Sequence, residues 1–213
     1  MHEGSIVVAH PAAATQLVLL FHGVGSSAEN LAPIGEAIAQ ARPKAVVVSV
    51  DAPHPSSLGS GKEWFSVVGV TEQNRPQRIA AVMTLFLKTV RHWQQRSGVG
   101  RQGTVLVGFS QGAIMSLEAT QAIATGEAIA SVVISLAGRF AQPVRQVPPS
   151  MRFHLIHGEQ DNVVATHWSI EAAQALKGSG ATVTLDLLPR LGHGIDGRAL
   201  RMVAAYLGGP SSP

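Results

Sequence analysis

Short apolar runs alternate with longer amphipathic segments along most of the chain. The runs are rich in valine, isoleucine and leucine and predict strands that are buried on both faces. They span residues 17–22, 45–50, 104–109, 132–137 and 153–157. Residues 182–188 instead alternate apolar and polar side chains, which predicts a half-buried strand.

Apolar residues at helical spacing fill most of the intervals between these strands. The clearest segment is 76–96, where Ile79, Met83 and Phe86 share one face and Pro76 suits a first helical turn. Further helices are predicted over residues 29–41, 111–124, 165–177 and 196–207. Alternation of this kind is typical of an α/β fold with a mostly parallel central sheet and helices on both of its faces.

Two segments follow neither pattern. Residues 51–73 are rich in proline, glycine and serine and include Trp64 and Phe65, and residues 138–150 contain three prolines. A long irregular loop inside a compact domain is usually functional. The length of 213 residues suits a single domain over residues 1–208, with no cap domain, followed by a flexible tail over residues 209–213.

Composition and charge exclude several classes of protein. With 46% hydrophobic and 14% charged residues the chain is not of the disordered type, and without cysteine it is not a disulfide scaffold. No apolar run approaches the ~18 residues of a membrane span. The net charge is only +3 and the arginines are dispersed, so no nucleic-acid partner is expected. The N-terminus lacks the pattern of a signal peptide, which favours the cytoplasm.

The sequence G-F-S-Q-G at residues 108–112 lies between a predicted strand and a predicted helix. This G-x-S-x-G pattern is typical of a nucleophile on a sharp strand-to-helix turn, where the residues two positions to either side must be small. The turn lifts the hydroxyl clear of the sheet and directs the helix N-terminus at the site. Ser110 is therefore the candidate nucleophile, the alternative being an idle serine in a turn of small residues.

A serine hydroxyl becomes a good nucleophile when a base accepts its proton, and the base needs an acid to orient it. With this turn, the expected chain order is nucleophile, acid, base. Asp161 follows the strand predicted over 153–157, and His193 follows the one over 182–188. Ligands of open parallel sheets bind at the carboxyl ends of the strands, so we interpret Asp161 as the acid and His193 as the base. Glu159 is the alternative acid.

Other ionisable residues have simpler interpretations. Asp186 lies in mid-strand on the polar face and is expected to be solvated, while Asp196 is expected to cap the last helix. His154 and His157 alternate with apolar residues within a strand, so we expect packed, hydrogen-bonded histidines there. The histidines lack metal-ligand spacing, and neither a metal nor an organic cofactor is predicted.

Acyl transfer also requires backbone donors for the oxyanion. One is expected to be the N–H of Gln111, directly after the nucleophile. The other is assigned to the N–H of Val24, in the loop F-H-G-V-G at residues 21–25, where glycines let the backbone approach a substrate. The alternative is that these glycines only make a tight turn.

The same loop also matches a different fingerprint. Residues 23–28 read G-V-G-S-S-A between a predicted strand and a predicted helix, and Asp51 ends the next strand. This is locally a dinucleotide-binding pattern. Dinucleotide binding would leave Ser110, Asp161 and His193 unexplained, whereas ester hydrolysis explains them and the glycine loop as well.

Six motifs, in chain order F-H-G-V-G-S-S, D-A-P, E-W-F, G-F-S-Q-G-A, H-G-E-Q-D-N-V-V and L-G-H-G-I-D, resemble the bacterial carboxylesterase branch of the phospholipase/carboxylesterase family. That group is similar to the acyl-protein thioesterases and has the α/β-hydrolase fold. The resemblance spans residues 17–207 and implies a Ser110–Asp161–His193 triad. It also implies an oxyanion hole at Val24 and Gln111. The loop between Pro53 and Trp64, residues 54–63, departs from the thioesterase pattern.

The sequence thus predicts a serine esterase for carboxylic esters or thioesters of small to medium acyl groups. Acyl-protein or lysophospholipid substrates are the alternative within this class, and a silent hydrolase-fold binding module is the alternative outside it. The resemblance places Trp64 and Phe65 near the acyl pocket, and the expected pocket residues are Trp64, Phe65, Leu136, Val163 and Ile195. Exposed apolar residues around 51–73 could also serve a homodimer.

Overall fold

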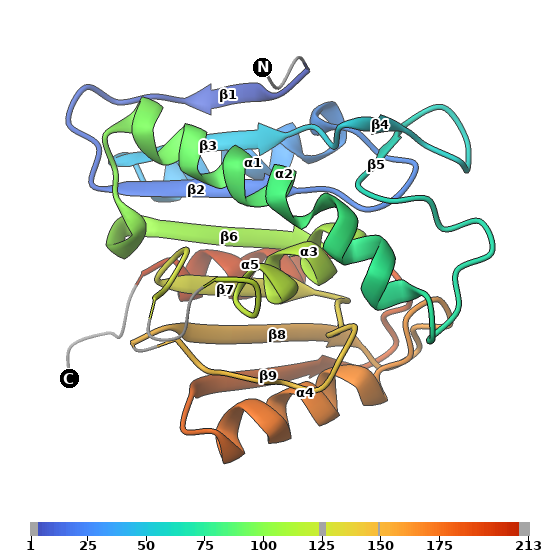
Figure 1. Ribbon diagram of the computed structural model, residues 1–213. Coiled ribbons are helices and arrows are strands. Elements are labelled where there is room, and N and C mark those ends of the chain that lie inside the picture. Colours follow the sequence, from blue (N-terminus) through green and yellow to red (C-terminus); the bar gives the residue numbers. More distant parts are fainter. Residues whose placement is uncertain (1–3, 124–126, 149, 209–213) are drawn as a thin grey trace.

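The computed structural model describes residues 4–123, 127–148 and 150–208 (Figure 1). The strands of its main sheet are β1 (Ile6–Ala9), β2 (Gln16–Phe21), β3 (Ala45–Val50), β6 (Thr104–Phe109), β7 (Val132–Leu136), β8 (Arg152–Gly158) and β9 (Thr182–Leu188). Their order across the seven-stranded sheet is β1-β3-β2-β6-β7-β8-β9. β1 is antiparallel to β3, and every other pair of neighbours is parallel. The predicted mostly parallel sheet is confirmed.

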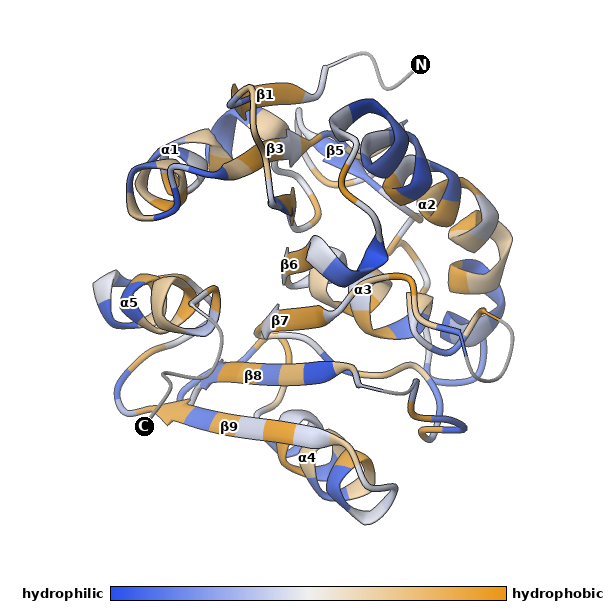
Figure 2. Cartoon of the chain, turned by 90° about the vertical axis from the view of Figure 1, so that its left-hand side faces the viewer, coloured by the Kyte–Doolittle hydropathy of each residue, from blue (hydrophilic) through white to orange (hydrophobic). Residues whose placement is uncertain are grey.

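Helices cover both faces of this sheet, as the alternating pattern predicts. They are α1 (Ala28–Ala41), α2 (Arg75–Ser97), α3 (Gln111–Ala119), α4 (His167–Gly178) and α5 (Gly197–Tyr206). α1 and α5 lie on one face, and α2, α3 and α4 lie on the other (Figure 2). Each face has its own hydrophobic core, because the strands between them are apolar on both sides.

The strand register gathers the loops that carry the candidate chemistry. Phe21 pairs with Gly108, and Leu136 pairs with both Phe109 and Ile156. β2, β6, β7 and β8 therefore end together at the right-hand edge of Figure 1, and β9 joins them there through its parallel pairing with β8. The loops that follow β2, β6, β8 and β9 meet at this carboxyl edge.

The structure differs from the sequence-based prediction at β1, at a short hairpin between β3 and α2, and at the end of α3. β1 and a short hairpin, β4 (His54–Pro55) with β5 (Lys62–Glu63), were not predicted. The helix predicted over residues 111–124 ends at Ala119, because the Thr120 hydroxyl and backbone N–H both bond the Leu117 carbonyl and turn the chain. The end of that prediction and the predicted flexible tail, residues 209–213, lie outside the described residues.

A buried histidine makes the stability of the fold dependent on pH. The ring of His154 stacks on Tyr206, with centroids 3.8 Å apart, and contacts the Thr184 hydroxyl at 2.9 Å. Burial lowers the pKa of His154 from 6.5 to about 4, helped by the nearby Arg152. Between these values the unfolded chain binds a proton that the folded chain does not, so folding weakens as pH falls through this window.

We therefore expect the free energy of unfolding to decrease between pH 6.5 and about 4, with a contribution from His154. Its size should be on the order of 1 kcal/mol or more. Urea denaturation of the wild type and of His154→Gln at pH 7 and pH 5 measures it. The variant should lose less stability on acidification, and equal losses would contradict the assignment.

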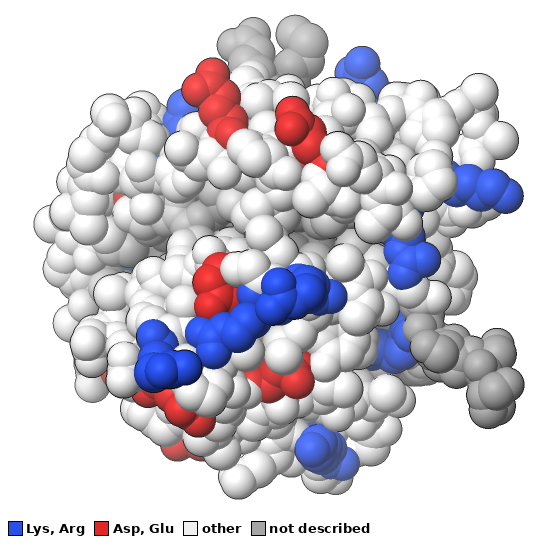
Figure 3. Space-filling view, turned by 180° about the vertical axis from the view of Figure 1, so that it is seen from behind, with Lys and Arg blue, Asp and Glu red and all other residues white. Residues whose placement is uncertain are grey.

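Charges of both signs are interspersed on the surface shown in Figure 3, where basic side chains lie beside acidic ones. No helix in the described part of the chain combines the length and the apolar character that crossing a bilayer requires.

Candidate active site

Ser110 occupies a strained backbone turn between β6 and α3. Its φ and ψ of 52° and −115° lie in a region that non-glycine residues rarely adopt, at a cost of about 1–3 kcal/mol. Its N–H is held by the carbonyl of Leu136 at 2.9 Å. A Cβ added to Gly108 would overlap the backbone of Ala113, and one added to Gly112 would overlap the carbonyl of Phe21. The close packing of the turn thus explains both glycines of G-x-S-x-G.

Gly112→Ala is expected to destabilise the protein by about 3 kcal/mol or more. The added Cβ would overlap the Phe21 carbonyl, and relieving that overlap would require α3 to move away from β2. Gly178 at the end of α4 is a matched control, since a Cβ there meets nothing within 4 Å. Gly178→Ala should leave stability unchanged or raise it slightly. Free energies of unfolding in urea test both, and a Gly112→Ala protein of wild-type stability would refute this account.

The three residues predicted to form a triad are joined by hydrogen bonds. The Ser110 hydroxyl lies 2.9 Å from His193 Nε2, and His193 Nδ1 lies 2.7 Å from Asp161 Oδ2. Because a carboxylate only accepts, Nδ1 carries the proton and Nε2 is free to accept the serine proton. The loops carrying Asp161 and His193 are themselves connected, as the N–H of Gln160 donates to the carbonyl of Leu191 at 2.9 Å.

The surroundings keep the Asp161 carboxyl ionised. Burial alone would raise its pKa, but the hydrogen bond from His193 and the N–H groups of Val164 and Val163 outweigh burial and lower the pKa below the usual value. Both N–H groups donate to Oδ1 at 2.8 Å. Such a carboxylate can stabilise an imidazolium at His193. The exposed Glu159, the alternative acid, has no contact of this kind with His193 among the described residues.

The loop after β2 lies directly against the nucleophile. A Cβ on Gly23 would be 3.1 Å from the Cβ of Ser110, so only glycine lets this backbone approach so closely. The N–H of Val24 donates to no acceptor within the described part of the chain. Gln111 is the first residue of α3, so its N–H has no carbonyl one turn earlier to bond. Both predicted oxyanion donors are therefore available.

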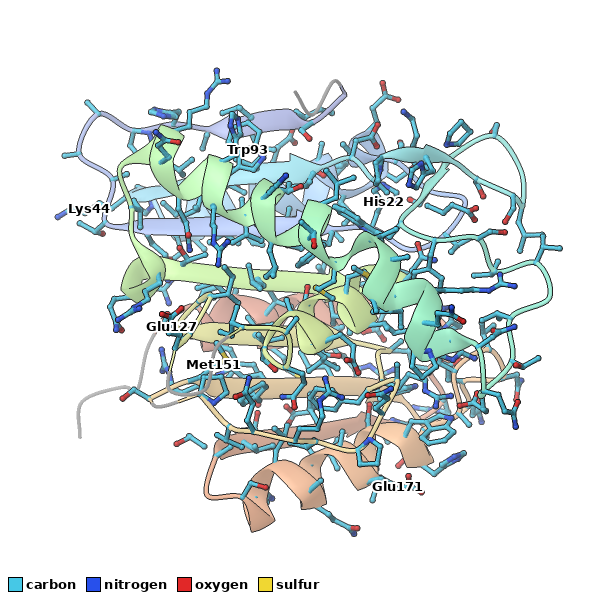
Figure 4. All side chains as sticks on the ribbon, viewed as in Figure 1. His22, Lys44, Trp93, Glu127, Met151 and Glu171 are labelled. Atoms are coloured by element: carbon cyan, nitrogen blue, oxygen red, sulfur yellow. The ribbon has the colours of Figure 1, made fainter. Side chains whose placement is uncertain are left out.

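His22 holds this loop in place. Its side chain is buried, its Nδ1–H donates to the Gly23 carbonyl at 2.7 Å, and its Nε2 accepts the N–H of Ala52 at 3.0 Å. Burial lowers the pKa of His22, which favours this neutral form. Because the carbonyl and N–H of one trans peptide point in opposite directions, fixing the Gly23 carbonyl also fixes the direction of the Val24 N–H. Figure 4 shows His22 at the carboxyl edge, opposite Lys44.

The side chain of Gln111 fastens the 51–73 segment to the nucleophile turn. Its Oε1 accepts the N–H of Trp64 at 2.7 Å, and its Nε2 donates to the carbonyl of Phe65 at 2.8 Å. Gln111 thus has two roles. Its backbone N–H lies next to Ser110 in the chain, and its side-chain amide holds the E-W-F motif in place.

The five expected pocket residues do not gather on one surface. Trp64 is fully buried and packs against Phe21 and Phe86, with ring centroids 6.2 and 4.8 Å away. Phe65 belongs to the same core, whereas Leu136 and Ile195 pack in the core on the opposite face of the sheet, and Val163 is 72% exposed. Trp64 and Phe65 pack in the core because α2 provides apolar partners for them. The sequence did not reveal that α2 packs against this loop.

Sequence reasoning missed a cavity on the face of the sheet that α4 covers. It has a volume of about 470 Å³ and lies between residues 139–144 and α4. Phe140, Trp168 and Ala172 are among its apolar walls. Arg139 closes one side, with its guanidinium stacked 3.4 Å from the Trp168 ring centroid and hydrogen-bonded to Glu72.

Asp51 has a structural role that argues against the dinucleotide alternative. Its Oδ1 accepts the N–H of Ala28 at 2.9 Å, at the first turn of α1, and its Oδ2 lies 3.7 Å from the Lys62 ammonium. The carboxylate occupies the helix N-terminus that a pyrophosphate would need. Asp196 caps α5 as predicted, whereas Asp186 is not simply solvated, since it accepts the Tyr206 hydroxyl.

Similar proteins are consistent with this geometry. The phospholipase/carboxylesterase family model matches residues 2–208. Esterase YpfH of Escherichia coli (strain K12) is 43% identical over 206 residues, which cover 97% of this chain and 88% of that protein. The crystal structure of esterase PE8 superposes with a TM-score of 0.85 at 28% identity, covering 95% of each chain. Acyl-protein thioesterase 2 of Zea mays shares the fold, with a TM-score of 0.76 at 20% identity and coverage of 95% and 96%. This chain therefore belongs to the phospholipase/carboxylesterase family and has the α/β-hydrolase fold.

Proposed function

We propose that this chain is a serine hydrolase that cleaves carboxylic esters, thioesters included, through a Ser110–His193–Asp161 triad and an acyl-enzyme intermediate. The observation that carries the proposal is the unbroken hydrogen-bond chain from the Ser110 hydroxyl through His193 to Asp161. It lies at the carboxyl edge of the sheet, where the family's fold binds its ligands. The family assignment and the esterase relative support the same reaction class.

In the first half of the reaction, Ser110 Oγ attacks the acyl carbon while its proton passes to His193 Nε2. The carbonyl oxygen becomes an oxyanion, and the N–H groups of Val24 and Gln111 stabilise it. Asp161 stabilises the imidazolium through its bond to Nδ1. The C–O or C–S bond then breaks, the leaving alcohol or thiol takes the proton from Nε2, and the acyl group stays on Ser110.

In the second half, water takes the place of the alcohol. His193 Nε2 accepts one proton of the water as its oxygen attacks the acyl carbon. The same oxyanion donors stabilise the second intermediate. Collapse breaks the bond to Ser110 Oγ, which recovers its proton from His193, and the free acid leaves.

The cavity beside α4 is our candidate for the acyl group. Its wall at residues 139–144 begins just after Gly138, and β7 contacts the nucleophile turn through the Leu136 carbonyl. Arg139 is paired with Glu72, and the exposed Glu171 is the remaining charged residue of the lining, so the apolar walls suit an uncharged chain. Acyl-protein or lysophospholipid substrates would use the same machinery. A homodimer and a cytoplasmic location stay predictions from the sequence.

Labelling with a fluorophosphonate probe tests the proposal. An activated serine forms a covalent adduct, whereas a silent hydrolase-fold module does not. Peptide mapping should place the adduct on Ser110, and an excess of a nitrophenyl ester present during the reaction should slow the labelling. Absence of an adduct at Ser110 in folded protein would refute the proposed function.

A further inference from the structure

A second histidine lies against the acid of the triad. The side chain of His157, on β8, is fully buried. Its Nε2 is 3.1 Å from Asp161 Oδ2, the same oxygen that contacts His193. The Nε2 atom also lies 2.8 Å from the carbonyl of Val164, and Nδ1 lies 2.7 Å from the Ser169 hydroxyl on α4. The mechanism above assigns no role to either His157 or Ser169.

These contacts fix where the proton of His157 lies. The Val164 carbonyl and the Asp161 carboxylate can only accept, so Nε2 carries the hydrogen and is shared between them. Burial lowers the pKa of His157 below its ordinary value, against the opposing influence of the Val164 carbonyl and Asp161. In the resulting neutral ring Nδ1 is an acceptor, and the Ser169 hydroxyl, 2.7 Å away, is placed to donate to it; the Gly138 carbonyl, 3.2 Å from the same hydroxyl, is the other acceptor within reach. A hydroxyl donor at Nδ1 supports the tautomer in which Nε2 points an N–H at Asp161.

The carboxylate of Asp161 is consequently held from both sides. Oδ1 accepts the N–H groups of Val163 and Val164, and Oδ2 accepts the N–H groups of His193 and His157. These four donors prevent the Asp161 carboxylate from rotating freely about its Cβ–Cγ bond. The His157 donor also takes a share of the negative charge that would otherwise face His193 alone.

We propose that His157, oriented by Ser169, is a positioning residue that keeps Asp161 Oδ2 aligned with His193 Nδ1 and limits the basicity of that carboxylate. The inference rests on the proposed triad function. It predicts that loss of the His157 donor both loosens Asp161 and lets it hold the His193 proton more tightly. The titratable groups facing His157 are Asp161 and His193, and α4 contributes the uncharged Ser169, whose hydroxyl also contacts the Gly138 carbonyl. His193 faces Asp161, Ser110 and the ring of Phe109.

The test is the pH profile of kcat and kcat/KM for a short nitrophenyl ester with His157→Leu, which removes the donor at similar size, and with Ser169→Ala. We expect His157→Leu to lower kcat about tenfold with KM little changed. The acid limb should move to higher pH by about one unit, because a lost hydrogen bond to a charged group corresponds to a shift of that size. Ser169→Ala should shift the limb in the same direction by less.

His154→Leu is the matched control, since it removes another buried histidine from the same strand. It should change stability and leave the acid limb in place. If His157→Leu is folded but its acid limb and kcat match the wild type, the inference is overturned. Should that variant fail to fold, Ser169→Ala decides in the same way: a shifted limb supports the inference and an unshifted one overturns it. Failure of the proposed function is distinguishable, because wild-type protein would then form no fluorophosphonate adduct at Ser110.

Discussion

Ser110→Ala is expected to lower kcat for short nitrophenyl esters by a factor of about 10⁴–10⁶ and to leave the fold intact. The Ser110 hydroxyl is the only part of the triad chain that would bond to the substrate, and alanine removes just that oxygen. His193→Ala should cost a similar factor, since an unassisted hydroxyl is a weak nucleophile. Steady-state assays of the purified variants measure both losses.

The double variant Ser110→Ala, His193→Ala should be no slower than either single variant, because residues that act as one unit are not additive. Ser97→Ala is the matched control. Its hydroxyl caps the end of α2 by donating to the Gln94 carbonyl. This control should retain wild-type kcat. Substantial hydrolysis by folded Ser110→Ala protein would remove Ser110 from the mechanism.

Trp64→Ala is expected to destabilise the protein by about 3–5 kcal/mol, as truncation of a large buried aromatic leaves a cavity. At this chain length such a loss corresponds to roughly 10 °C in Tm. Differential scanning calorimetry and urea unfolding measure it. The acyl chain-length profile at a temperature where the variant is folded should be little changed, because the indole packs on Phe21 and Phe86 rather than lining the cavity beside α4.

Ala175→Trp provides the contrast. Ala175 lines the cavity and is exposed, so a bulky side chain there should depress hydrolysis of long-chain esters and spare acetate esters. A chain-length profile that follows Trp64→Ala and ignores Ala175→Trp would instead place the acyl group against the loop aromatics.

Sequence patterns predicted much of the sheet because its central strands are apolar on both faces, and short continuous apolar runs of this kind are typical of buried parallel strands. They did not predict β1, whose four residues are only partly buried at the edge of the sheet. Chain order and strand ends brought Ser110, Asp161 and His193 together as candidates, and the structure places these three side chains within hydrogen-bond distance of one another. The sequence did not show that Trp64 is a core residue. An aromatic residue in an irregular segment gives the same sequence pattern whether it lines a pocket or packs in a core. That distinction depends on how residues 51–73 fold onto α2.

The supporting histidines were missed for a related reason. His157 alternates with apolar neighbours, which correctly indicated a packed and hydrogen-bonded side chain. Its partners, Asp161 and Ser169, lie beyond the end of its own strand, so the pattern did not reveal what it bonds. His22 immediately precedes Gly23 in the glycine loop, and that position was the available signal for a residue that orients the loop.

The strained backbone of Ser110 lowers the stability of the folded protein in order to present the hydroxyl. Glycine adopts φ of 52° and ψ of −115° far more readily than serine, so Ser110→Gly should give an inert protein that withstands heat better than the active one. If Ser110 is the nucleophile as we propose, selection for thermal stability alone would favour its loss, and a screen for more stable variants of this enzyme needs to select for turnover at the same time.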